Sequence, residues 1–140
     1  MTYIYYANRD TKGEGILRYM FYSAFDKSWM KRCTSLAELS KALYESLLTI
    51  GAVVLIIGDR EELEDILSLK DVLSGINVIV ILSSQANISP RAVLPLRPRF
   101  LTWTDSDLSN AVDVLERVIK IRTRLKGIDT IMPKLGLPGC

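Results

Sequence analysis

Apolar residues along this chain fall into two kinds of pattern. Residues 52–57 and 76–82 are nearly unbroken apolar runs rich in β-branched side chains, which is typical of parallel strands covered on both faces. Shorter segments rich in strand-forming residues occupy 2–7, 28–33 and 100–103. The pattern therefore predicts five strands.

Apolar residues at helical spacing separate these strands and predict helices over roughly 14–26, 35–50, 59–75 and 107–126. Ser35 and Glu38 form a capping-box pattern at the start of the second helix, and Gly51 is expected to end it. Asp105 or Ser106 is expected to cap the final helix. Each predicted strand is thus followed by a helical segment or a proline-rich loop.

Strands that alternate with helices through short connections predict a parallel sheet with helices on both faces. We expect the flavodoxin-like three-layer sandwich, with strand order 2-1-3-4-5. This order places the charged 28–33 strand at an edge and the two most apolar strands at the centre. Residues 83–99 contain three prolines, so the fourth helix should be short or absent, with Ser89 as its cap and Pro90 in its first turn. We expect one domain over 1–126, followed by a tail or linker over 127–140.

The amino-acid composition excludes several kinds of functional site. The 140 residues include no histidine and only two cysteines, Cys33 and Cys140, which excludes a Ser-His-Asp triad, an imidazole metal site and a disulfide scaffold. No apolar run reaches the roughly 18 residues of a membrane span, and no secretory signal is apparent, so we expect a cytoplasmic protein. The net charge is only +2, and the basic residues of 120–126 lack interleaved aromatics. A nucleic-acid partner is therefore not expected.

Two segments, VIVILSS at 78–84 and FLTWTDSDLSNAVDVLERVIK at 100–120, carry a resemblance to a known family. Together with the element order, they resemble the receiver domain of two-component response regulators over about residues 2–122. The resemblance implies a phosphoacceptor aspartate at the end of the third strand and an acidic pair after the first strand that holds Mg²⁺. It also implies a serine or threonine at the end of the fourth strand and a lysine at the end of the fifth.

This sequence departs from that pattern. Its first strand ends in Ala7–Asn8 without an acidic pair, Asp10 lies further into the loop, and Trp103 occupies the lysine position. Ser83 matches the family, but Asp59 directly precedes a helix, where an N-cap is the simpler interpretation and a phosphoacceptor role the weaker one. We therefore expect a degenerate receiver that is not an enzyme, has no catalytic residue, and needs neither metal nor cofactor.

Such a module would act through protein–protein contacts in signal transduction. Arg91, Arg97 and Arg99 lie in or near the segment that replaces the fourth helix, in the region that transmits signals in receivers. With Trp103, Ile121 and Leu125 they form a candidate interaction surface. A helix over 107–126 spans roughly 30 Å, whereas a six-residue strand covers about 20 Å. We therefore expect the apolar end of this helix and the tail to be covered by a second copy, in a homodimer. The alternative is a tail that folds back on its own domain or is disordered.

The alternative is a flavodoxin-like protein that binds a small molecule or nucleotide through the loop over 8–15. Thr11, Lys12, Gly13 and Gly15 could surround a phosphate ahead of a helix N-terminus. Glu14 would oppose an anion, and no established phosphate-binding motif is present. The structure of the loop at the strand carboxyl ends should distinguish the two interpretations.

Overall fold

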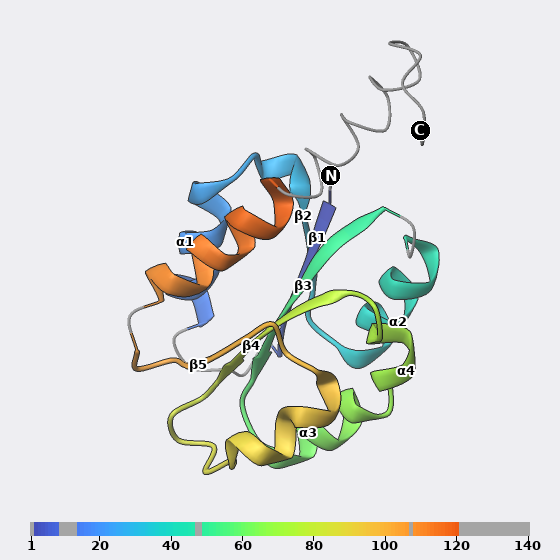
Figure 1. The fold of residues 1–140 in the computed structure, drawn as a ribbon, viewed down its shortest axis with the longest axis vertical. Helices are drawn as coiled ribbons and strands as arrows, with labels where there is room; N and C mark the ends of the chain where they lie inside the picture. Colours follow the sequence, from blue (N-terminus) through green and yellow to red (C-terminus); the bar gives the residue numbers. More distant parts are fainter. Residues whose placement is uncertain (1, 9–13, 47–48, 107, 121–140) are drawn as a thin grey trace, which may run out of the picture.

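The structure is a computed structural model, and it describes residues 2–8, 14–46, 49–106 and 108–120. Within these residues the sheet has five parallel strands in the order β2-β1-β3-β4-β5, which confirms the predicted topology (Figure 1). The strands are β1 (Thr2–Ala7), β2 (Met30–Cys33), β3 (Ile50–Ile57), β4 (Asn77–Leu82) and β5 (Phe100–Trp103). The helices are α1 (Glu14–Ala24), α2 (Leu36–Glu45), α3 (Arg60–Leu67), α4 (Lys70–Leu73) and a last helix over 109–120, with 3₁₀ turns η1 (Lys27–Trp29) and η2 (Pro90–Leu96).

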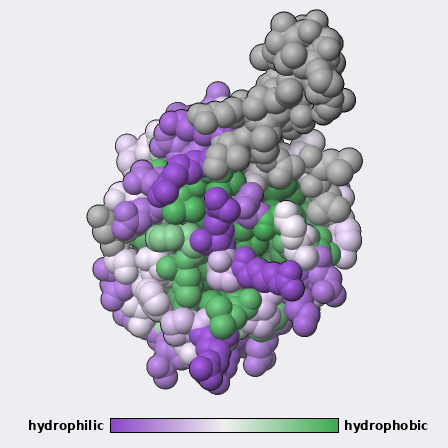
Figure 2. All heavy atoms as spheres, in the orientation of Figure 1, coloured by the Kyte–Doolittle hydropathy of each residue, from purple (hydrophilic) through white to green (hydrophobic). Residues whose placement is uncertain are grey.

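Alternate residues of each central strand enter two separate cores, one on each face of the sheet. Val53, Leu55 and Ile57 of β3 join the core beneath α2, α3, α4 and η2. Val54 and Ile56 join the core beneath α1 and the last helix. The molecule is thus the expected three-layer sandwich (Figure 1). On the face that Figure 2 shows, apolar side chains are visible between hydrophilic ones. No helix in the described ranges is both long and apolar enough to cross a membrane.

The beginning of the central strand corrects one prediction. Ile50 and Gly51 were expected at the end of the second helix, but α2 ends at Glu45 and both residues belong to β3. Thr2 pairs with Ile50 and Tyr3 with Ala52, so Gly51 is the extra residue of a bulge. Gly51 therefore fits an irregularity in the strand and does not end a helix.

Polar side chains shape the helices around the sheet. Ser35 accepts a hydrogen bond from the backbone N–H of Glu38, as the capping-box pattern predicts. The helix expected over 59–75 is in fact two helices, α3 and α4. The Ser68 hydroxyl donates to the carbonyl of Asp65 at 2.5 Å, and a bond of this kind competes with the regular helical pattern where α3 ends.

The segment between β4 and β5 has the short form that its prolines predict. Ser89 caps the 3₁₀ turn η2, and Pro90 lies at its start. The predicted cap of the last helix is wrong: Ser106 donates its N–H to the carbonyl of Trp103 in a turn, and the Leu108 carbonyl accepts the first helical hydrogen bonds. The predicted domain boundary after residue 126 lies outside the described residues.

Candidate functional site

The carboxyl ends of the strands bring together most of the residues that the receiver resemblance singles out. Asn8 follows β1, Gly58 and Asp59 follow β3, Ser83 follows β4, and Trp103 ends β5. Because all five strands are parallel and adjacent, their carboxyl ends lie on the same side of the sheet, and so do these residues (Figure 1). We call this row of strand ends the carboxyl edge. In open α/β sheets, this is where ligands bind.

Asp59 is the N-cap of α3, as the sequence predicts. Its backbone is extended, and its Oδ1 accepts a hydrogen bond from the N–H of Glu62 at 2.8 Å. The Asp59 carbonyl also accepts the first helical hydrogen bond, from Leu63. The carboxylate thereby satisfies a backbone donor that would otherwise have no partner at the start of the helix.

Glu62 is a residue of this edge that our sequence interpretation missed. Its Oε2 accepts a hydrogen bond of 2.6 Å from the N–H of Gly58, and only 9% of the residue is exposed. Burial raises the pKa of its carboxyl group, and the negative charge of Asp59 raises it further, although the Gly58 N–H and the Asn8 side chain act in the opposite direction. The spacing of Asp59 and Glu62 is that of a capping box, a signal that could have identified this residue.

Acidic side chains surround the end of β3 at the carboxyl edge. Burial raises the pKa of the Tyr6 hydroxyl to about 12, and the nearby carboxylates of Glu62, Asp65 and Asp59 contribute to that rise. A phosphoryl group here would need cations to balance its charge. Within the described ranges, no cluster of three or more Asp, Glu, Cys or His side chains could hold a metal ion.

Ser83 occupies a turn after β4. Its N–H donates to the carbonyl of Ile57 at 2.9 Å, and its Oγ accepts from the N–H of Gln85 at 3.3 Å. Beside it, Thr104 Oγ1 accepts from the N–H of Ser84 at 3.1 Å, which ties the end of β5 to this turn. The hydroxyl of Ser83 therefore helps to hold the connection that leaves the sheet.

Trp103 lies at the position where the family resemblance implies a lysine. The residue is half-buried and packs against the core beneath α2 and α3. An indole has no cationic group with which to hold a phosphate. Its place in the structure is that of a packing residue at the end of an edge strand.

Of the four residues that could surround an anion in the loop over 8–15, only Gly15 falls within the described residues. Gly15 lies in the first turn of α1, and a Cβ added there would meet no atom within 4 Å. This position does not require glycine for a close approach of the backbone. Thr11, Lys12 and Gly13 lie outside the described residues.

The candidate interaction surface is partly described. Arg91, Arg97 and Arg99 are all exposed, and Leu94 between them has 60% of its surface accessible. Arg97 is in the left-handed conformation, with φ of 51°, and its N–H donates to the carbonyl of Leu94 to end η2. The predicted members Ile121 and Leu125 lie outside the described residues.

Comparison with known proteins supports the architecture. No family model matches the sequence, and no curated protein matches it. Among solved structures, the crystal structure of NtrX from Brucella abortus in complex with ADP is similar, with 10% identity and a TM-score of 0.58. The match covers 97% of this chain but only 30% of the NtrX chain. The likeness, together with the strand order, shows that this chain has a flavodoxin-like fold, which it shares with part of the NtrX chain.

Proposed function

We propose that this chain is a receiver-like module of cytoplasmic signal transduction that works through protein contacts, without a phosphorylated aspartate and without enzymatic activity. The observation that carries the proposal is the position of Asp59. Its Oδ1 is hydrogen-bonded to the N–H of Glu62 at 2.8 Å, at the very start of α3. A phosphoacceptor must turn a carboxylate oxygen toward the phosphoryl donor, whereas the hydrogen bond to Oδ1 holds this carboxylate at the start of a helix.

The charges around Asp59 support the same proposal. Phosphoryl transfer to a carboxylate requires cations that offset the charge on the transferred group. Here a second acidic side chain, Glu62, is buried close enough to Asp59 for the two charges to interact, and the residue at the end of β5 is Trp103. This arrangement disfavours an additional anion at the carboxyl edge.

The surface that we propose for partner binding is formed by η2 and the segment that leads into β5. It carries exposed Leu94 together with Arg91, Arg97 and Arg99, and η2 itself contains no acidic residue. An exposed apolar side chain surrounded by arginines suits a partner that presents apolar and acidic groups, because arginine pairs well with carboxylates and is enriched in interfaces.

Intact-mass measurement tests the central claim. The full chain is incubated with acetyl phosphate and Mg²⁺, next to a phosphorylatable receiver that shows that the donor is active. We expect no gain of a phosphoryl group on this chain. A gain that is lost in the Asp59→Asn variant would overturn the proposal, because it would show that Asp59 accepts phosphate despite its capping bond.

A further inference from the structure

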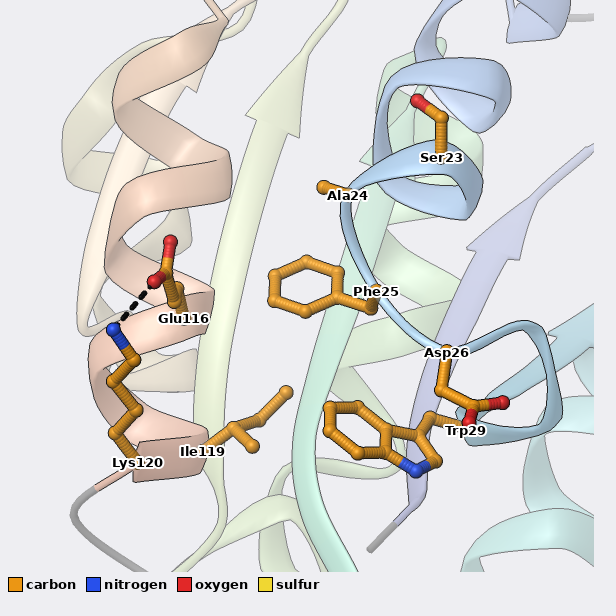
Figure 3. A pocket seen from close by; sticks show the side chains of 8 residues that line it. All are labelled: Ser23, Ala24, Phe25, Asp26, Trp29, Glu116, Ile119 and Lys120. Carbon is orange, nitrogen blue, oxygen red and sulfur yellow. Dashed lines mark ion pairs between the residues drawn. The ribbon is translucent and has the colours of Figure 1, made fainter.

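A groove with a volume of about 690 Å³ lies at the opposite end of the sheet from the carboxyl edge. One wall is the end of α1 with the η1 turn that leads into β2, and the other is the stretch of the last helix from Glu116 to Lys120 (Figure 3). Residues that are far apart in the sequence therefore meet here, because α1 and the last helix cover the same face of the sheet. Nothing in the proposed function uses this groove.

The groove is apolar inside and charged at its rim. Phe25 and Trp29 reach into it from one side and Ile119 from the other (Figure 3). Phe25 and Trp29 are only half-buried, with ring centroids 6.4 Å apart, and Phe25 also packs edge-on against Tyr3 at 5.7 Å. These aromatic rings are held in place by the core yet remain accessible.

The charged side chains that line the groove already have partners of their own. On the last helix, Lys120 pairs with Glu116 at 2.6 Å, so that these two charges offset each other. On the other side, Asp26 accepts hydrogen bonds from the backbone and hydroxyl of Ser28, which lower the pKa of its carboxyl group. An apolar segment could therefore enter the groove without leaving an unpaired buried charge.

We propose that this groove binds the apolar segment 128–137 of the same chain. That segment contains five apolar side chains within ten residues: Ile128, Ile131, Met132, Leu135 and Leu137. It contains one acidic and one basic residue, so it carries no net charge into the groove. Its composition matches the apolar interior of the groove.

The position of the last helix brings this segment within reach. The described part of the chain ends at Lys120, which itself lines the groove. With the helix continuing to 126 as the sequence predicts, residues 121–126 add only about 9 Å to its length, so the segment begins close to the groove. A tethered segment also has an effective concentration in the millimolar range, which favours binding within one chain over capture of a second copy.

Paramagnetic relaxation measurements on the full chain test this proposal. A nitroxide label is attached to Cys140, three residues beyond the segment. Burial raises the pKa of the Cys33 thiol to about 11, so Cys33 stays protonated near neutral pH and does not compete for the reagent. We expect the amide signals of Phe25 to Trp29, across the groove from the tether, to be lost with the oxidised label and regained on its reduction.

Two variants make the result specific. Ile131→Asp places a charge in the middle of the segment and should restore the signals of Phe25 to Trp29. Ile16→Asp is the matched control, because Ile16 is 72% exposed on α1 and does not line the groove. This control should leave the signal loss unchanged.

Two outcomes would overturn the proposal. The first is that the signals of Phe25 to Trp29 are unaffected by the label. The second appears in a mixture of isotope-labelled protein without nitroxide and unlabelled protein with nitroxide. Signal loss in that mixture would show that the segment of a second copy enters the groove, as in the homodimer that the sequence suggested.

Discussion

Replacing the N-cap of α3 should destabilise the protein by a predictable amount. In Asp59→Ala, the N–H of Glu62 loses its acceptor at 2.8 Å, and the N-terminus of α3 loses a negative charge. Loss of a cap costs about 0.5–2 kcal/mol of unfolding free energy. For a cost of about 1 kcal/mol and a slope of about 2 kcal/mol per molar, the urea midpoint falls by about 0.5 M.

Three further variants separate the contributions to this cost. Asp59→Ser and Asp59→Asn both keep an acceptor but lose the charge. Each should therefore lose only the contribution of the helix dipole, about 0.3–1 kcal/mol, and remain more stable than Asp59→Ala. Glu64→Ala removes an exposed acid from the same helix without removing a cap and should change the midpoint little. Equal midpoints for Asp59→Ala and the parent in equilibrium urea unfolding, followed by circular dichroism, would refute the capping role.

Three other predictions concern the buried carboxyl, the core and the loop over 8–15. The pKa of Glu62 is raised on folding, so its stabilising contribution is greatest at acidic pH and is lost as the pH rises through the folded-state pKa. Urea unfolding across pH 4–8 should therefore show Glu62→Gln gaining stability relative to the parent with rising pH; a relative loss would contradict the burial argument. Leu55→Ala, at a fully buried position, should cost about 2–5 kcal/mol, whereas Leu94→Ala, which is 60% exposed, should change the unfolding free energy by less than about 0.5 kcal/mol. In a thermal-shift screen, nucleotides and flavins should leave the melting temperature unchanged. A ligand that binds at a hundred times its Kd would add about 2.7 kcal/mol to the unfolding free energy. A shift that is abolished by Lys12→Ala would favour the small-molecule alternative.

Local signals were sufficient to predict the strand order. Unbroken apolar runs identify the two central strands, and the exposed Lys31 and Arg32 identify an edge strand, because each property depends on how much of a strand is covered. The caps at Ser35 and Asp59 were predictable for a similar reason, since a cap needs only its own residue and the next few along the chain.

Features that depend on tertiary contacts were not predictable in this way. The strand around Ile50 begins early because it pairs with Thr2, a contact between residues 48 positions apart. The groove could not be predicted from the sequence, because Phe25 and Ile119, which both line it, are more than 90 positions apart in the chain. The bond of Glu62 to the Gly58 N–H is local and could have been predicted from the capping-box spacing, but the burial of the Glu62 carboxyl group depends on the fold.

The pairing of the first and last helices on one face has a consequence for biosynthesis. Among the described residues, those that form the core beneath α2, α3, α4 and η2 all precede residue 104, so they have all been made once β5 has been made. The opposite core needs Ala111, Leu115, Val118 and Ile119, the last of its members to leave the ribosome. Until then, Tyr5 and Ile56 are not covered by the last helix. The nascent chain therefore has one face of the sheet that is covered and one that exposes apolar side chains and can aggregate. The second face of the sheet therefore stays uncovered until the residues of the last helix that pack on it, Ala111 to Ile119, have been made.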